Sequence, residues 1–144
     1  MRKQTYTMIA AVLVLGCLTV SANAQCGGIP LIAKIPFQFS TRDATLPAGE
    51  YVVKCLDPNQ HQLLFQSTDG KAAAIMPVIL VNGKSQGGMR LVFHRYGRRY
   101  FFVQAWADGS NGLELPTTRA ESAAAQELAG IEPKHETIAL TARR

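Results

Sequence analysis

The segment Met89–Ala107, MRLVFHRYGRRYFFVQAWA, constrains the fold more than any other part of the chain. Gly97 divides it into two apolar runs, which is typical of two strands joined by a tight turn at Tyr96–Arg98. The second run holds two adjacent phenylalanines, Phe101 and Phe102, so apolar side chains lie on both of its faces. The segment therefore predicts a β-hairpin with a second strand that is buried on both sides.

The length of the hairpin loop decides which side chains share a face. With a two-residue loop, one face carries Leu91, Phe93, Tyr100, Phe102 and Trp106. The other face then carries Val92, His94, Phe101, Val103 and Ala105. We expect the second strand to be covered on both sides, for instance by a second sheet layer and by a helix. A three-residue loop would exchange the pairing of the faces.

Other stretches alternate in the way of half-buried strands, namely Lys34–Ser40, Glu50–Leu56 and His61–Ser67. Lys71–Val81 is apolar but is interrupted by Pro77, which predicts a bent or bulged strand. Near the end of the chain, Thr137–Thr141 alternates again and predicts either a last edge strand or a frayed tail.

One helix is expected, over about residues 118–129. Thr118 can cap its first turn, Glu121 stands at the capping-box spacing, and Gly130 can end it. The domain would cover residues 34–144, after an irregular lead-in over residues 25–33. We therefore expect a mainly β fold, an antiparallel sandwich or small barrel of about seven strands with one short C-terminal helix.

Residues 1–24 have the features of a secretory signal peptide. A basic start at Arg2 and Lys3 precedes the apolar run Met8–Val20, and Ala22–Ala24 has the small-x-small pattern of a cleavage site. The run is shorter than the roughly 20 residues of a membrane-spanning helix. We expect cleavage before Gln25, an exported chain in the periplasm or outside the cell, and no transmembrane span in the mature protein.

The cysteines are interpreted in the light of export. Cys17 follows Gly16 in a loose lipobox, so a lipid anchor is a less favoured alternative to plain cleavage. Cys26 and Cys55 would remain in the mature chain and would meet an oxidising compartment, where a disulfide can form. A disulfide between them would raise the free energy of unfolding by about 3–4 kcal/mol. The alternative is that the chain end around Cys26 is loose and that Cys55 keeps its thiol.

The charge of the chain is mild. It has 15 basic and 10 acidic residues, a net charge of +5, and removal of Arg2 and Lys3 takes away two of those positive charges. Such a balance favours solubility, and together with the expected export it predicts no nucleic acid partner.

A series of motifs runs through most of the mature chain between Lys34 and Ala129: IPFQF, LPAGEY, DGKAAA, LVFHRYGRRYFF, DGSNGLELP and TRAE. Their order resembles that of a family of small exported bacterial proteins of unknown function. The resemblance is densest at LPAGEY and VFHRYG. It implies an exported, mostly β protein and attaches no activity, ligand or cofactor to it. Cys26 and Cys55 are not part of the pattern.

Known catalytic and cofactor motifs are not found. His61, His94 and His135 form no H-x-H or HExxH group and join no CxxC group, so no metal site is expected. The chain has no G-x-S-x-G elbow and no Walker or dinucleotide loop, so no catalytic residue and no cofactor are assigned. A Cys–His pair between Cys55 and His61 or His94 remains open.

The most specific feature left is a group of basic and aromatic residues in the hairpin. Its members are Arg90, His94, Arg95, Tyr96, Arg98, Arg99 and Tyr100. Arginine binds carboxylates and phosphates bidentately and stacks on aromatic rings, so the group could hold an anionic glycan, a lipid headgroup or an acidic protein. The alternative is a solvated hairpin end whose charges keep strand edges from pairing.

These observations predict an exported, non-catalytic β-domain that binds a ligand or has a structural role in the cell envelope. One alternative is a small secreted enzyme with a site near His94. Another is a small barrel that carries an apolar ligand between its layers.

Overall fold

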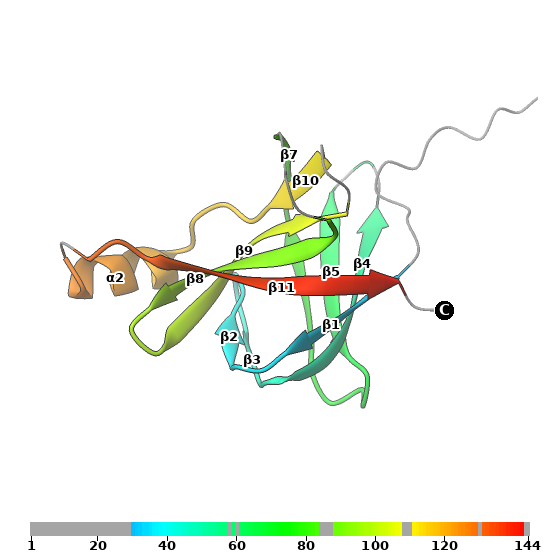
Figure 1. Ribbon diagram of the computed structural model, residues 1–144, viewed down its shortest axis with the longest axis horizontal. Helices are drawn as coiled ribbons and strands as arrows, with labels where there is room; N and C mark the ends of the chain where they lie inside the picture. Colours follow the sequence, from blue (N-terminus) through cyan, green and yellow to red (C-terminus); the bar gives the residue numbers. More distant parts are fainter. Residues whose placement is uncertain are drawn as a thin grey trace, which may run out of the picture.

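The computed structural model describes residues 30–57, 59, 61–83, 88–107, 111–129 and 131–142. Within these ranges the chain forms an eleven-stranded sheet and one helix, which confirms the expected mainly β class (Figure 1). The expected signal peptide, Cys17 and Cys26 lie outside the described residues.

The elements follow one another as β1 (Leu31–Ile35), β2 (Phe39–Ser40), β3 (Thr45–Leu46), β4 (Gly49–Asp57), β5 (Gln62–Ser67), β6 (Ala73–Pro77), β7 (Ile79–Asn82), β8 (Arg90–Tyr96), β9 (Arg99–Trp106), β10 (Asn111–Glu114), α2 (Arg119–Glu127) and β11 (Lys134–Ala142). In the described residues the strand count exceeds the expected seven. The additional strands are short, and no alternating run predicts β3 or β10. The predicted strand Lys34–Ser40 is divided, because its first residues belong to β1, its last two form β2, and residues 36–38 between them are not in a strand.

The sheet is nearly closed into a barrel. Its strand order is β3-β2-β9-β8-β11-β1-β4-β5-β6, and β10 pairs with both β7 and β9. The expected bend falls between β6 and β7 at Val78, whose N–H donates to the carbonyl of His61 at 2.8 Å. The first half of the bent strand, β6, pairs with β5, and the second half, β7, pairs with β10. Because β10 also pairs with β9, the sheet returns to β9 and nearly closes.

The last strand is not at an edge. β11 pairs with β8 on one side and with β1 on the other, so the expectation of an edge strand or frayed tail is wrong. Alternation within Thr137–Thr141 shows that one face is buried but carries no information about the neighbours on either side. The first described strand also begins earlier than expected, at Leu31, inside the expected lead-in over residues 25–33.

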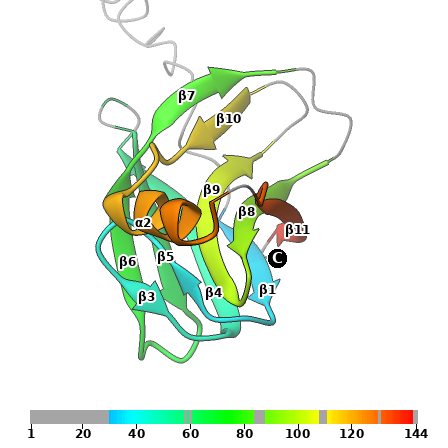
Figure 2. The same cartoon turned by 90° about the vertical axis from the view of Figure 1, so that its left-hand side faces the viewer.

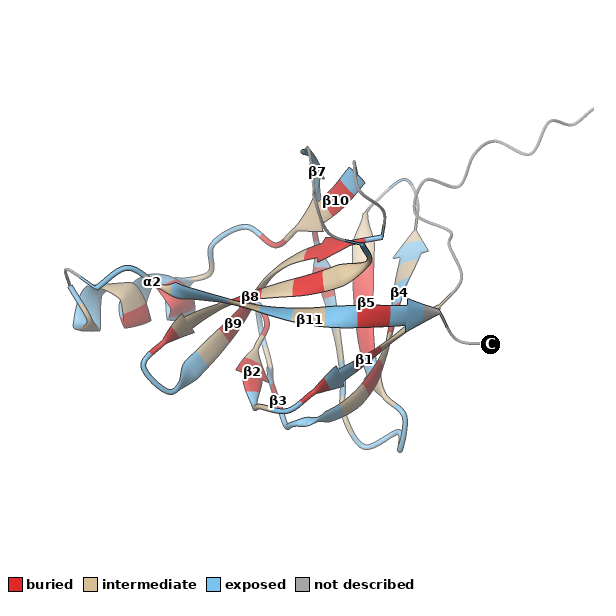
Figure 3. Cartoon of the chain, in the orientation of Figure 1, coloured by how far each residue is buried: buried red, intermediate tan, exposed pale blue. Residues whose placement is uncertain are grey.

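Aromatic rings fill the interior of the barrel, and the strands around it carry buried positions (Figure 3). Phe39 contacts Phe93 with ring centroids 5.3 Å apart, and Phe65 contacts Phe102 at 4.9 Å, each near the edge-to-face arrangement that aromatic pairs prefer. Tyr51 also lies in this core and is 1% exposed. The alternating residues of β4, β5, β8 and β9 therefore point at one another across the barrel.

The central hairpin has the two-residue loop. Tyr96 pairs with Arg99, and Gly97 takes a φ of +62°, as a glycine at the first loop position allows. Near the turn the predicted faces are correct, because Phe93 lies opposite Phe102 and both are in the core.

Further from the turn the predicted faces are wrong. A bulge makes Val92 pair with Gln104, so Val103 is an extra residue in β9. Ala105 instead of Trp106 then lies opposite the core residue Leu91. One inserted residue exchanges the two faces of a strand, and this is the physical reason for the error.

The second face of the hairpin is covered by α2, as expected. Tyr96, Phe101 and Ala124 form a small cluster there, with Leu128 at its border. Figures 1 and 2 show α2 at the same end of the molecule as the β8–β9 turn. The predicted cap is confirmed, because the N–H of Glu121 donates to Oγ1 of Thr118 at 3.2 Å.

Candidate functional site

The hairpin end brings together most of the basic and aromatic residues that the sequence singles out. Arg95, Tyr96, Arg98, Arg99 and Tyr100 all lie at or next to the two-residue loop. Arg90 does not belong to this group: it lies at the opposite end of β8, where it pairs with Trp106. The sequence groups Arg90 with the others only because it is close to them in number.

Arg95 is held in place on the core side of the hairpin. Its Nε donates to the carbonyl of Gly97 at 2.8 Å, and its guanidinium lies 5.5 Å from the ring centre of Tyr100. Tyr100 in turn stacks on Phe37, with centroids 3.8 Å apart and ring planes 10° apart. Nη1 of Arg95 is 3.7 Å from Oε1 of Glu136. The position of this arginine is therefore set by three elements of the fold.

Arg98 and Arg99 extend the positive charge toward the helix. Arg98 lies in the turn and is exposed. Arg99 forms an ion pair with Glu127 of α2, and these side chains are 50% and 63% exposed. Exposed pairs of this kind contribute little free energy, so a multivalent anion can compete for the arginine.

A buried carboxylate lies beneath the helix side of the hairpin. Oε1 of Glu121 is 2.6 Å from Nδ1 of His94 and 3.2 Å from the hydroxyl of Tyr96, which donates to it. Glu121 is 5% exposed, so the two partners satisfy a charge that burial would otherwise penalise. Burial, followed by the nearby charge of Glu121, raises the pKa of Tyr96.

Sequence reasoning did not assign this role to Glu121. In a capping box the glutamate side chain turns back to the backbone N–H of the cap. Here the backbone N–H of Glu121 donates to Oγ1 of Thr118, whereas the carboxylate of Glu121 contacts His94 and Tyr96. A charged residue at a helix position that faces a sheet is the signal that could have found it.

His94 has a second neighbour, His135 of β11. The two residues pair directly across the strands, and their ring centroids are 4.7 Å apart with an interplanar angle of 85°. In the described part of the chain, no group of three or more His, Cys, Asp or Glu residues is placed to hold a metal ion. The third histidine, His61, lies in a turn with a φ of +48°.

The outer face at the far end of the hairpin carries a polar chain around Trp106. The indole N–H donates to Gln104 at 3.1 Å, and the amide of Gln104 donates to Glu114 at 2.6 Å. The guanidinium of Arg90 lies 5.3 Å from the Trp106 ring centre. Arg90 therefore supports the packing of Trp106 against β10.

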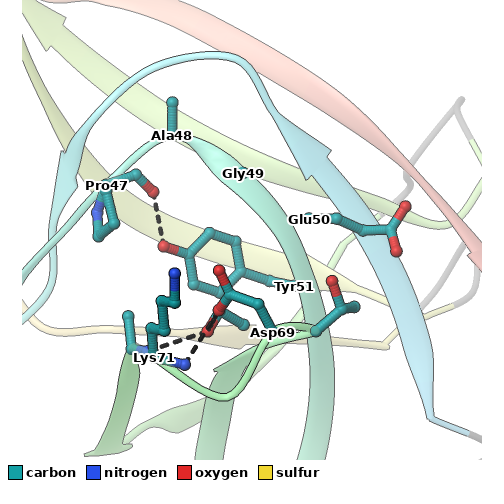
Figure 4. A pocket seen from close by; sticks show the side chains of 10 residues that line it. Pro47, Ala48, Gly49, Glu50, Tyr51, Asp69 and Lys71 are labelled. Atoms are coloured by element: carbon teal, nitrogen blue, oxygen red, sulfur yellow. Dashed lines mark hydrogen bonds between the residues drawn. The ribbon is translucent and has the colours of Figure 1, made fainter.

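A small hollow of about 150 Å³ lies beside the turn that precedes β4 (Figure 4). Tyr51, whose hydroxyl donates to the carbonyl of Pro47, and Asp69 line it. Asp69 accepts hydrogen bonds from the hydroxyl of Ser67 and from the N–H of Lys71, and these lower its pKa, the bond from Ser67 most. Burial raises the pKa of Tyr51. Pockets for drug-sized ligands are larger, roughly 300–1,000 Å³. These polar contacts fix the turn.

Cys55 lies in β4 opposite Leu63 and is half-buried. Its predicted partner, Cys26, is outside the described residues, so the disulfide stays a prediction. The described histidines are not hydrogen-bonded to Cys55, and the hydrogen bond of His94 goes to Glu121.

The chain matches no protein-family model, no curated protein and no solved structure. Among the residues in the described ranges, no helix has the length and apolar character needed to cross a membrane. The geometry of the hairpin end therefore carries the functional argument.

Proposed function

We propose that this chain is an exported, non-catalytic binding domain of the cell envelope and that it binds an anionic ligand through Arg95, Arg98 and Arg99. The observation that carries the proposal is the fixed position of Arg95, which the Gly97 carbonyl and the Tyr100 ring hold in place. A guanidinium that is already ordered loses little side-chain entropy when it binds an anion.

The charge at the hairpin end supports an anionic ligand. Three arginines lie in or next to one two-residue turn, with Arg95 on the core side of the hairpin and Arg99 on the helix side. Two carboxylates, Glu127 and Glu136, offset them only in part. Ion pairs at this exposure are worth about 0–1 kcal/mol. A phosphate or polycarboxylate that offers bidentate contacts to the same guanidinium groups can replace them.

The support beneath these arginines is rigid. The Phe37–Tyr100 stack lies on one face of the hairpin, and the cluster of Tyr96, Phe101 and Ala124 lies on the other. A two-residue loop between strands that are packed on both faces leaves the backbone few alternative conformations. The turn can therefore present its arginines in one arrangement.

The alternatives receive less support. Aromatic side chains occupy the barrel interior in the described residues, and the hollow by Tyr51 is small, so a carrier of an apolar ligand lacks a compartment there. The contact between His94 and Glu121 is of the kind that orients a general base. In the described part of the chain, however, no Ser, Thr or Cys side chain is hydrogen-bonded to His94.

Binding of the mature chain to two probes tests the proposal. The probes are vesicles of phosphatidylcholine with and without phosphatidylglycerol, and the soluble polyanion polygalacturonate. We expect binding to at least one anionic probe, no binding to neutral vesicles, and weakening as salt is added. The double variant Arg95→Glu/Arg98→Glu should lose binding.

The matched control is Arg42→Glu/Lys54→Glu, which makes the same change of charge at two exposed positions outside the hairpin. It should bind almost as the unchanged protein does. Equal loss in both double variants would show that only the net charge matters. No binding to either anionic probe at low salt would overturn the proposal.

A further inference from the structure

The pairing of β8 with β11 places two histidines directly opposite each other. His94 and His135 are register partners, so their side chains leave the sheet on the same face. Their ring centroids are 4.7 Å apart. Directly opposed residues have Cβ atoms about 4.5–5.5 Å apart, which lets two imidazoles reach one ion held between them.

Glu121 determines which nitrogen of His94 can bind an ion. A carboxylate only accepts hydrogen bonds, so the contact of 2.6 Å makes Nδ1 of His94 the donor. In the neutral ring the lone pair then lies on Nε2. A metal-ligating histidine commonly donates its other ring N–H to a carboxylate in this way, which fixes the tautomer and increases the basicity of the ligand.

We propose that His94 and His135 form a two-histidine site for a divalent transition metal ion, with Glu121 as the carboxylate that orients His94. Two imidazole ligands suit Cu²⁺, Ni²⁺ and Zn²⁺, and among these the Irving–Williams order places Cu²⁺ first. Water fills the remaining coordination positions. The site goes beyond the anion-binding function proposed above and does not depend on it.

The surrounding charges permit a cation at this place. Arg95 follows His94 in β8, but successive side chains of a strand point to opposite faces, and Arg95 lies with Tyr100 and Glu136 on the core side. Glu121 adds a negative charge directly behind His94, and Tyr96 is bonded to the same carboxylate. Lys134, beside His135 in β11, points to the opposite face for the same reason and is exposed.

Metal binding needs one side-chain movement. Two nitrogens that each lie about 2.0–2.1 Å from one ion are on the order of 3 Å apart, so the edge-to-face contact of the rings must open. His94 is held by Glu121 and is 23% exposed, whereas His135 is exposed. His135 is therefore the ring that moves toward His94.

Titration of the tag-free mature chain with Cu²⁺, followed by calorimetry and by electron paramagnetic resonance, tests the site. We expect one ion per chain with nitrogen hyperfine coupling. His135→Ala changes an exposed side chain and should weaken binding by at least about 100-fold, because loss of a supporting carboxylate alone costs about 10–100-fold. Glu121→Gln should weaken Cu²⁺ binding by only about 10–100-fold.

His61→Asn is the control, since asparagine tolerates the left-handed backbone of His61 and the other two histidines are kept. It should bind Cu²⁺ as the unchanged protein does. Unaltered binding in His135→Ala would place the ion elsewhere, for example at the chain terminus, and would overturn the proposal. Loss of binding in His61→Asn, or no binding by the unchanged protein, would overturn it as well.

Discussion

The indole of Trp106 lies flat on Gly112 of the neighbouring strand. A Cβ atom on Gly112 would come within 2.9 Å of two indole carbons, so only glycine fits beneath the ring. Gly112 pairs with Trp106 across β9 and β10, and it also pairs with Val81 of β7. This close approach joins β10 to the rest of the sheet at the place where the barrel closes.

Replacement of Gly112 by alanine should destabilise the protein. The added methyl group forces the Trp106 ring or the β10 backbone to shift, and overpacking of this kind typically costs about 1–3 kcal/mol. Urea unfolding, monitored by the fluorescence of the single tryptophan, measures the change. Gly88→Ala is the control, because a Cβ at Gly88 would meet nothing within 4 Å. Equal stability of the two variants would contradict the interpretation of the contact.

Replacement of Glu121 by alanine should lower the free energy of unfolding by more than about 1 kcal/mol. The change leaves the Nδ1–H of His94 and the hydroxyl of Tyr96 without their acceptor beneath the helix. Glu127→Ala in the same helix is the matched control, since its ion pair with Arg99 is exposed and should contribute less than about 1 kcal/mol. Similar losses in both would show that Glu121 acts only as a helix residue.

Stability should fall at alkaline pH, in part because of Tyr96. Burial and the charge of Glu121 raise the pKa of this tyrosine in the folded state. The unfolded chain then loses the Tyr96 proton first, near pH 10, so this contribution is complete below pH 10 and is lost as the pH rises through the higher folded value. Urea unfolding between pH 8 and 11 should show a smaller decline for Tyr96→Phe. An unchanged decline in that variant would assign the effect to other groups, Tyr51 among them.

The expected processing and disulfide can be tested by one mass measurement. The intact protein, taken from its own cells without reductant, should have the mass of Gln25–Arg144 less two hydrogens. Addition of reductant should restore those two hydrogens. A mass with all hydrogens before reduction would contradict the Cys26–Cys55 bond, and a lipidated product beginning at Cys17 would contradict plain cleavage.

The sequence predicts the hairpin well near its turn and poorly at its far end. Gly97 requires a tight loop, and the loop sets the register that places Phe93 opposite Phe102. The bulge at Val103 reverses the faces beyond that point, so Trp106 lies on the face opposite to the side chain of Leu91 and is buried there against Gly112. No residue type in this part of β9 demands a bulge, so the local sequence does not predict it.

The candidate site could likewise be predicted from the sequence only where its residues are close together in the chain. The run of arginines around Gly97 could be found because local spacing places them together. Glu121 and His135 are 27 and 41 positions from His94, and they reach it only through the docking of α2 and the pairing of β11. Such contacts depend on the order of strands in the sheet, which alternation in a single strand does not encode.

The position of β11 between β1 and β8 also affects how the protein can fold. Leu31, in the first described strand, is the register partner of Ala142, at the end of the last. A chain that still lacks β11 has two unpaired strand edges, one on β1 and one on β8. The pairing of β1 with β11 joins strands from the two ends of the described chain, and pairing of strands so far apart in sequence is slow. The barrel therefore cannot close before β11 has been synthesised, and until then the edges of β1 and β8 remain available to pair with other strands.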